Sequence, residues 1–335
     1  MTTRQLACSA LLVTLAACTS QPGTGAPSSD SASPQVPTTS PSNMSHGEAP
    51  VGTVVDAAPV DPAPPPRAAR RVVHVRFEMR DTVIEISKGV KYRAWSFAGS
   101  VPGPVVRVTQ GDSVDFTLVN RAAIPHSMDF HAAQIAPDKY YVNVMPNDSI
   151  RYQFIAEVPG AFMYHCGTAP VAAHIANGMY GALIVDPRVA RPAAREMVFV
   201  QSEFYLKPDT TAAPKVLSWE RLLSLAPDYV TFNGRSAQYA EHPISVKVGE
   251  LLRLYVVNAG PNRTSSFHVV GGIFNRVFID GSLANPLTGV QTVAVPVGGG
   301  SIFEIRLKEA GEYPFVTHAF ADATKGGVGI FKAQP

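Results

Sequence analysis

The stretch Gly160–Met179, GAFMYHCGTAPVAAHIANGM, contains Cys166, the one cysteine beyond the N-terminal segment, together with His174 and Met179. A thiolate, two imidazoles and a weak axial thioether are the ligands of blue-type copper centres. The second imidazole must come from elsewhere in the chain, and His126 is available upstream. The stretch therefore predicts a copper centre built on a β-strand and the loop that follows it.

A histidine, His165, directly precedes Cys166 in GAFMYHC. Neighbouring side chains of a strand point to opposite faces of the sheet. If Cys166 faces one metal, His165 then faces different surroundings. This pair is the first indication of a second metal site beside the first.

The composition indicates an all-β protein with a substantial core. Of the 335 residues, 46% are hydrophobic and 16% charged, and there are 29 prolines and 26 glycines. Apolar residues with a helical period are scarce, whereas turn residues separate short alternating segments. The length allows two domains. The net charge of +2 gives no reason to expect a nucleic-acid partner.

The N-terminus has the pattern of an export signal. Arg4 and a short apolar run precede Leu-Ala-Ala-Cys, which resembles the lipobox of bacterial lipoproteins. We expect residues 1–18 to be a signal peptide that ends at a lipidated Cys18; the alternative is an ordinary cleaved signal. Because Cys8 also lies in this segment, the folded part keeps a single cysteine, which excludes a disulfide framework.

Residues 19–71 are rich in Pro, Ser, Thr, Ala and Gly, as in SSDSASPQVPTTSPS. Such a composition cannot bury enough apolar surface to offset the entropy of ordering. We expect a disordered linker between the lipid anchor and the globular part. No later segment reaches about 20 apolar residues, so the anchor is the only predicted membrane attachment.

From Val72 onwards short strands alternate with turns, and VVHVRFEM and TVIEIS are expected to form the first strand pair. The chain then repeats itself: FNGRSAQYAEHPISVKVGELLRLYVVN (232–258) parallels FAGSVPGPVVRVTQGDSVDFTLVN (97–120). Seven or eight short strands per unit predict a β-sandwich. We expect two tandem sandwich domains, at residues 72–188 and 189–335.

The segment PHSMDFH contains His126, Asp129 and His131. In a regular extended segment, a separation of five residues puts two side chains on opposite faces. We therefore expect His126 to join Cys166 and His131 to join His165. Two imidazoles alone would hold a metal weakly.

The second domain has no cysteine and no matching methionine, yet it keeps His268 and His318 at the corresponding places of the repeat. One of them is expected to complete the second site, either within the chain or from a neighbour in a homo-oligomer. The remaining histidines, His46, His74 and His242, fit neither site.

The motifs FAGSVPGP, HSMDFH, GAFMYHC, HIANGM, SSFHVVG and THAF together resemble the two-domain copper nitrite reductases, over about residues 72–332. The resemblance implies two cupredoxin domains, a homotrimer and two coppers per chain. It implies a type 1 copper whose ligands are His126, Cys166, His174 and Met179. It implies a type 2 copper between protomers, whose ligands are His131, His165 and the neighbouring chain's His318. Two residues would handle protons beside the type 2 copper, Asp129 and His268.

The implied activity is the dissimilatory reduction of nitrite to nitric oxide, which consumes one electron and two protons. The electron would come from a small redox protein, a cupredoxin or a cytochrome c, on the periplasmic side of a bacterial membrane. It would pass through Cys166 and His165 to the second copper. Three neutral imidazoles and an open position are typical of a catalytic metal.

Several features depart from the family pattern, including the segment IAPDKYYVNVMPND, where a Gly-rich stretch is expected. The loop from Cys166 to His174 is one residue shorter than in the best-known members, and Ala173 stands where many have Trp. Val270 stands where a larger Ile is common. We expect the loop to affect the potential of the first copper, and Val270 to affect the substrate pocket.

Two other functions stay open from the sequence. A laccase-like trinuclear cluster needs His-x-His pairs, and this chain has nine histidines without such a pair. An oxidoreductase of the multicopper oxidase superfamily with a mononuclear catalytic site is still possible. A non-catalytic copper electron-transfer lipoprotein would need only the first site, so a count of one or two coppers per chain separates it from the enzyme.

Overall fold

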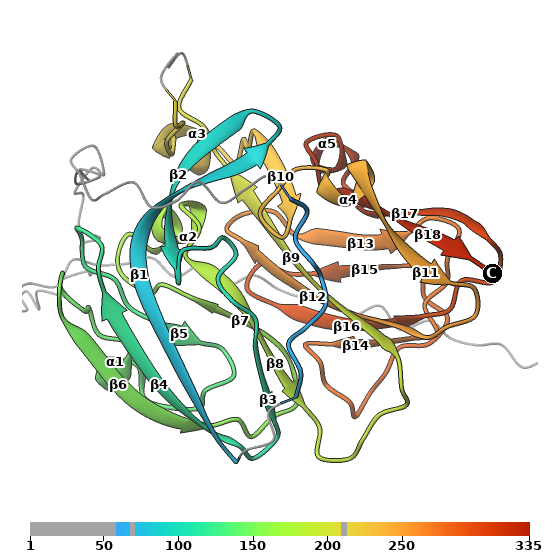
Figure 1. The fold of residues 1–335 in the computed structure, drawn as a ribbon, viewed down its shortest axis with the longest axis horizontal. Coiled ribbons are helices and arrows are strands. Elements are labelled where there is room, and N and C mark those ends of the chain that lie inside the picture. Colours follow the sequence, from blue (N-terminus) through green and yellow to red (C-terminus); the bar gives the residue numbers. More distant parts are fainter. Residues whose placement is uncertain (1–57, 68–70, 209–212) are drawn as a thin grey trace, which may run out of the picture. The chain divides into compact units, whose positions relative to one another are not determined.

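The computed structural model describes residues 58–67, 71–208 and 213–335. The predicted signal peptide with Cys18 and most of the predicted linker lie outside these ranges. The described elements are strands joined by turns and a few short helices (Figure 1). None of the described helices is both long and apolar enough to cross a bilayer.

The first sandwich consists of strands between Val72 and Asp186. They are β1 (Val72–Ser87), β2 (Val90–Phe97), β3 (Val106–Thr109), β4 (Ser113–Asn120), β5 (Asp129–Phe130), β6 (Ser149–Ile155), β7 (Gly160–His165) and β8 (Tyr180–Asp186). One sheet has the order β2-β1-β4-β6 and the other β3-β8-β7-β5.

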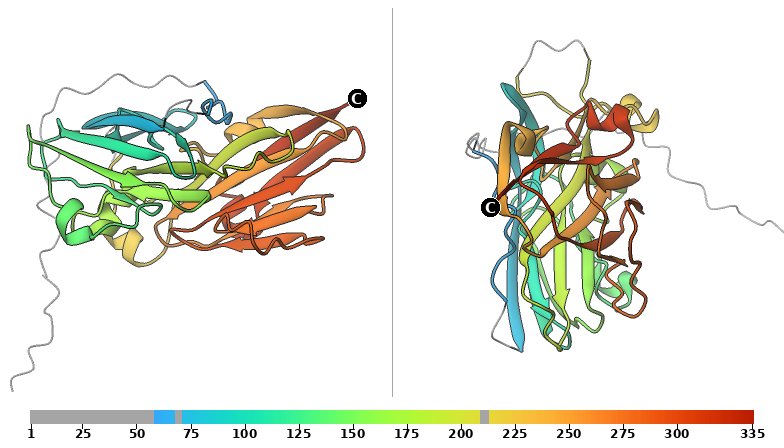
Figure 2. Two further views of the ribbon diagram at one scale, coloured as in Figure 1. Left: turned by 90° about the horizontal axis from the view of Figure 1, so that it is seen from below. Right: turned by 90° about the vertical axis from the view of Figure 1, so that its right-hand side faces the viewer.

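The second sandwich consists of strands between Arg195 and Gln334. They are β9 (Arg195–Phe204), β10 (Tyr229–Phe232), β11 (His242–Lys247), β12 (Leu252–Gly260), β13 (Ser265–Val269), β14 (Arg276–Ile279), β15 (Thr292–Val295), β16 (Gly300–Ile305), β17 (Gly311–Thr317) and β18 (Val328–Gln334). Its sheets have the orders β10-β9-β12-β16-β14 and β11-β18-β17-β13-β15. Figure 2 shows the strands of both sandwiches from two further sides.

The described helices are short and lie in the connections. They are α1 (Pro137–Tyr140), α2 (Val171–Ala176), α3 (Trp219–Leu223), α4 (Gln238–Glu241) and α5 (Phe320–Ala323). Two of them carry or follow candidate ligands, because His174 lies in α2 and His318 directly precedes the turn into α5. The chain is therefore all-β, with two tandem cupredoxin sandwiches.

The first sandwich buries the apolar residues that alternate with polar ones along its strands. Val114, Phe116 and Leu118 of β4 are fully buried in the first core, which also contains Cys166 and Met179. Because these side chains share one cluster, two of the candidate ligands, Cys166 and Met179, are packed into the apolar interior, which restricts their movement.

The two sandwiches share a further apolar cluster, in which Met163 of β7 packs with Val198 of β9, Tyr255 of β12 and Ile302 of β16. The backbones come close enough that a Cβ on Gly300 would lie 2.1 Å from the carbonyl oxygen of Ala161. Strand β7, which ends at His165, is thus held from both domains.

The first strand differs from the expected pair. Residues Val72–Ser87 form one continuous strand, β1, which pairs with both β2 and β4. No glycine, proline or asparagine interrupts it, and Arg80 and Asp81 pair with Ser96 and Trp95 of β2. The predicted pair of strands requires a turn at Arg80 and Asp81, but these two charged residues continue the ladder.

The end of the predicted linker also differs from expectation. Residues 58–67, here called the N-terminal strap (blue in Figure 1), are held on the globular part by hydrogen bonds. Their partners in the folded domains are Arg107, Val198, Arg235, Gln238 and Tyr239. Proline-rich extended chains leave their carbonyl groups free to accept. The composition of the segment does not predict that the folded domains provide donors for these carbonyl groups.

Candidate metal centre

Three ligand atoms converge in the first sandwich. The Nδ1 atoms of His126 and His174 lie 3.0 Å apart, and the Sγ atom of Cys166 lies 3.3 Å from Nδ1 of His174 and 3.9 Å from Nδ1 of His126. All three residues are buried. A trigonal site with metal–ligand bonds of about 2.0–2.3 Å separates its ligand atoms by about 3.5 Å, so the donor set fits one metal ion of this size.

Backbone contacts hold these residues in place. His126 exchanges two backbone hydrogen bonds with Val144, of 3.2 and 2.7 Å, and so has a fixed position in an otherwise irregular segment. The N–H of Cys166 donates to the carbonyl of Met179, and the N–H of Met179 donates to the carbonyl of His174, both at 3.1 Å. Met179 is fully buried in the same cluster as Cys166.

The electrostatics of this group suit a metal with soft ligands. Burial lowers the pKa of His126 well below its usual value and lowers the pKa of His174 to about 4. Burial also raises the pKa of the Cys166 thiol. Both imidazoles are therefore neutral at physiological pH, and a cation is needed to stabilise a thiolate here.

Two contacts around this group escaped the sequence analysis. The N–H of Ser127 donates to Sγ of Cys166 at 3.3 Å, and the N–H of Gly167 donates to the Ser127 hydroxyl at 3.0 Å. The Trp95 ring packs on His174 and His126, with centroid distances of 4.8 and 5.7 Å. Because Ser127 directly follows His126, its contact with the ligand group could have been predicted from the sequence. The position of Trp95 in the sequence does not indicate its contact with the two histidines.

A second group lies on the other side of the His165–Cys166 peptide. The Nε2 atoms of His131 and His165 lie 3.1 Å apart, and Oδ2 of Asp129 lies 3.8 Å from Nε2 of His165. His131 is exposed, whereas Asp129 and His165 are half-buried. Two imidazole nitrogens that face each other with an accessible third side fit a metal ion that is open to a small substrate.

The tautomer of His165 is set by its own backbone. Its Nδ1 lies 2.9 Å from the carbonyl oxygen of Cys166, so the ring donates there and leaves Nε2 free as a ligand atom. Burial lowers the pKa of His165, which keeps the ring neutral. The two groups are thus linked by a peptide bond and by this hydrogen bond.

The domain-2 histidines lie next to each other but do not join the second group within the chain. The rings of His268 and His318 are 5.3 Å apart, and Nδ1 of His268 lies 2.8 Å from the carbonyl oxygen of Gln291. Among the described residues, the second group, whose ligand atoms lie within 4.8 Å of one another, consists of Asp129, His131 and His165.

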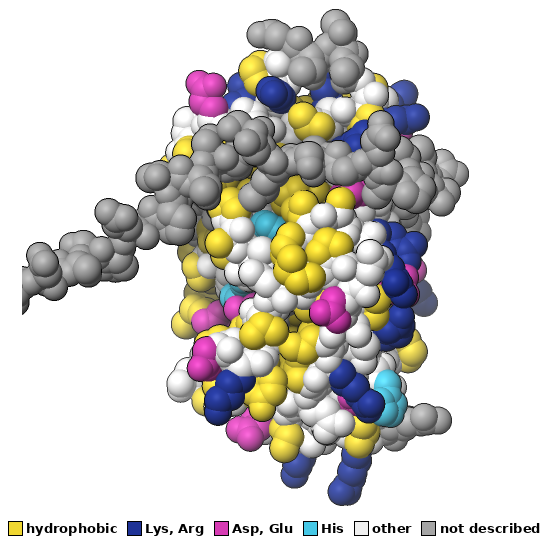
Figure 3. Space-filling model, turned by 90° about the vertical axis from the view of Figure 1, so that its left-hand side faces the viewer, with side chains coloured by type: hydrophobic (Ala, Val, Ile, Leu, Met, Phe, Trp, Pro, Cys, Tyr) yellow, Lys and Arg dark blue, Asp and Glu magenta, His cyan; other side chains and the backbone are white. Residues whose placement is uncertain are grey.

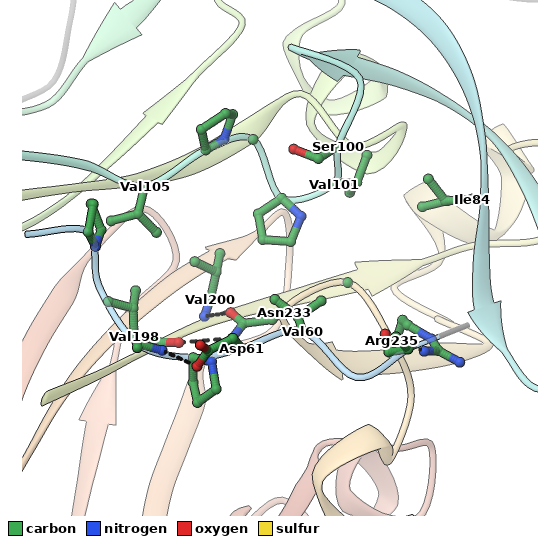
Figure 4. A pocket seen from close by; sticks show the side chains of 18 of the residues that line it. Val60, Asp61, Ile84, Ser100, Val101, Val105, Val198, Val200, Asn233 and Arg235 are labelled. Carbon is green, nitrogen blue, oxygen red and sulfur yellow. Dashed lines mark hydrogen bonds between the residues drawn. The ribbon is translucent and has the colours of Figure 1, made fainter. Parts of the chain in front are cut away.

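A separate cavity of about 440 Å³ lies under the N-terminal strap (Figure 4). Its walls are mostly apolar and include Val60, Ile84, Val101, Val105, Val198 and Val200. None of the described residues that line it is a histidine, cysteine or methionine. It therefore belongs to neither ligand group.

Comparison with known proteins identifies the relatives of this chain. The family model described as "Multicopper oxidase" matches residues 78–190. The copper-containing nitrite reductase of Neisseria gonorrhoeae is 37% identical over 297 residues, which cover 86% of this chain and 75% of that protein. That of Pseudomonas chlororaphis is 31% identical and covers 77% of both.

The solved structures agree with these relatives. The copper nitrite reductase of Nitrosomonas europaea superposes with a TM-score of 0.73 at 37% identity, covering 78% of this chain and 94% of that one. The enzyme from Thermus scotoductus also gives 0.73, at 34% identity, covering 78% of this chain and 62% of that one. With this similarity and the two ligand groups, the chain belongs to the copper-containing nitrite reductase family.

Proposed function

We propose that this protein is a copper-dependent dissimilatory nitrite reductase, which converts nitrite, one electron and two protons to nitric oxide and water. The observation that carries this proposal is the pair of ligand groups on adjacent residues, Cys166 in one and His165 in the other. Membership of the family supplies the substrate class.

The two groups would hold two coppers per chain. The type 1 ligands would be His126, Cys166, His174 and Met179. The type 2 ligands would be His131, His165 and the His318 of a neighbouring chain in a homotrimer. This division is supported by the position of His318 outside the second group of its own chain.

Bound copper supplies the one-electron chemistry and, at the second site, a Lewis acid for an oxygen of nitrite. Asp129 reaches the edge of that site, 3.8 Å from Nε2 of His165, and can hold the proton that the departing oxygen takes up. His268 donates from Nδ1 to Gln291, so its Nε2 is free to accept and pass on a second proton.

Electrons would arrive from a small redox protein, a cupredoxin or a cytochrome c, at the type 1 end. Figure 3 shows hydrophobic side chains gathered on one face of the molecule. The segment that backs His126 through Val144 contributes exposed apolar side chains, Val142 at 40% and Met145 at 53%. An apolar surface next to a buried ligand suits brief contact with such a donor.

We further propose that the chain is exported and lipid-anchored at Cys18 on the periplasmic side of the membrane. The support is the Leu-Ala-Ala-Cys sequence after a short apolar run. A Cys18→Ser chain should move from the detergent phase to the aqueous phase on phase separation. Unchanged partition would contradict the anchor.

The function is tested by anaerobic nitrite turnover with a reduced artificial donor, read as nitric oxide release. The wild type should be active, and His318→Ala should lose most activity while it keeps the colour of the first copper. An inactive wild type that carries its full copper load would overturn the proposal.

A further inference from the structure

His318 lies at a place where its own element provides little support. It follows β17 directly and precedes α5, a helix of four residues. Its backbone N–H donates to the carbonyl of Ser266 at 2.7 Å, and its ring contacts Phe320 at a centroid distance of 4.6 Å. A single helical turn is unstable by itself, so α5 needs an external anchor.

That anchor is a buried carboxylate. Asp322 of α5 is 1% exposed, and one of its oxygens accepts from Nε of Arg263 at 3.0 Å. The Arg263 side chain is 35% exposed, so the pair connects the interior to the surface. A charge-assisted contact of this kind is directional, and it fixes α5 with respect to the segment that holds Arg263.

The backbone of Arg263 is itself held by hydrogen bonds. Glu203 of β9 is 1% exposed and accepts from the backbone N–H groups of Asn262 and Arg263. The carbonyl of Arg263 accepts from the side-chain amide of Asn258 at 2.8 Å. The short segment around Arg263 is therefore tied to the central strands of the domain by several partners.

The same segment leads straight into β13, which carries His268. The ion pair between Arg263 and Asp322 therefore joins the segment that precedes His268 to the helix that follows His318. The rings of His268 and His318 lie 5.3 Å apart. We propose that Arg263 and Asp322 are positioning residues that present His318, with His268, for the type 2 copper of a neighbouring chain. This inference rests on the proposed function of His318.

The test compares Asp322→Asn and Arg263→Lys with the wild type. Loss of an outer partner of a ligand typically weakens metal binding about 10–100-fold. We expect the second copper to be lost that much more readily on dialysis against a graded chelator, with a changed type 2 signal in electron paramagnetic resonance. Lysine keeps the charge but not the planar fork, so Arg263→Lys should fall between the wild type and Asp322→Asn.

The matched control is Asp228→Asn in the same domain. Asp228 pairs with Arg221 at 2.8 Å and accepts from the N–H of Leu206, but it contacts neither histidine. It should lose stability without losing the second copper selectively. The first copper's absorption and the oligomer mass report whether each variant is folded.

The outcomes distinguish the positioning role of Arg263 and Asp322 from the proposed second copper site. Selective loosening of the second copper in the Arg263 and Asp322 variants, with the control unchanged, supports the inference. If the wild type holds two coppers and the variants hold the second copper as tightly as the wild type does, the positioning role is overturned but the proposed second site is not. A wild type with a single copper would overturn the proposed second site and the role of this pair with it.

Discussion

At the scale of single residues, Asp129 and His165 differ in what their surroundings allow. His165 is oriented by the carbonyl of Cys166 and is kept neutral by burial, which lowers its pKa. Asp129 approaches it at 3.8 Å from a half-buried position. A carboxyl that is close to the metal ligands but still accessible is suited to proton delivery rather than to ligation.

Asp129→Asn should therefore lower nitrite turnover about 10²–10⁴-fold, the range of a lost general acid, while both coppers stay bound. Turnover and copper content measured on the same sample check this. The control is Asp138→Asn in α1, an exposed residue outside both groups. Loss of the second copper in Asp129→Asn would instead mean that the carboxylate holds metal.

At the scale of elements, the sequence was most informative where a repeat or a parity rule applied. The repeat of residues 97–120 in residues 232–258 revealed two sandwiches, because the same turn and strand pattern requires the same packing. The parity rule expected His126 and His131 to face apart, and they lie in separate groups. Yet β5 is only two residues long, so the irregular bridge of His126 to Val144 contributes to this arrangement.

Contacts that depend on distant partners were not predictable. Trp95 reaches His174 because β2 lies against the connection that contains α2, which no local pattern of β2 encodes. The N-terminal strap is held by hydrogen-bond partners that lie more than a hundred residues away: Gln238 accepts from the N–H of Val60, and Tyr239 donates to its carbonyl. Composition describes how a segment behaves alone and not what it meets.

The strap gives a stability prediction. The Tyr239 hydroxyl donates to the carbonyl of Val60 at 2.9 Å and accepts from the Asn233 amide at 2.7 Å. Tyr239→Phe removes the hydrogen bond to the strap and takes one acceptor from the buried Asn233 amide, so it should lower the free energy of unfolding by about 1–3 kcal/mol and speed proteolysis of the strap. Tyr313→Phe, which removes an exposed hydrogen bond to Glu309, should change it by less than about 0.5 kcal/mol.

Strand β9 gives a pH prediction through Glu203. Burial raises the pKa of this carboxyl above 4.5, although the Tyr205 hydroxyl and two backbone N–H groups oppose the rise. Between 4.5 and the raised pKa, the folded chain holds a proton that the unfolded chain has released. The contribution of Glu203 to stability is therefore present at low pH and falls as pH rises through this window.

Glu203→Gln should remove that part of the pH dependence, because the amide does not titrate and can still accept a hydrogen bond. The measurement is urea unfolding of both chains from pH 4 to 8, compared as a difference curve. Parallel curves over the whole range would contradict the assignment.

At the scale of the whole molecule, the proposed division of the second site between chains predicts complementation. A His131→Ala chain and a His318→Ala chain should each lack an intact second site as homo-oligomers. In mixed oligomers, an intact second site forms wherever the His131 of a His318→Ala chain meets the His318 of a His131→Ala chain. Random mixing makes about a quarter of the sites intact, so co-refolded chains should recover about that share of nitrite turnover. No recovery would place the whole site within one chain.

The proposed division of the second site between chains has a consequence for the order of assembly. Under the proposal, a newly made chain can fold and fill its type 1 site alone, since the four proposed ligands all lie in the first sandwich. If His318 of a neighbouring chain completes the second site, as proposed, a single chain would not turn over nitrite until it meets other copies. Specific activity should therefore fall on dilution while the visible colour persists, and a solitary chain would carry an electron with no reactive metal on which to discharge it.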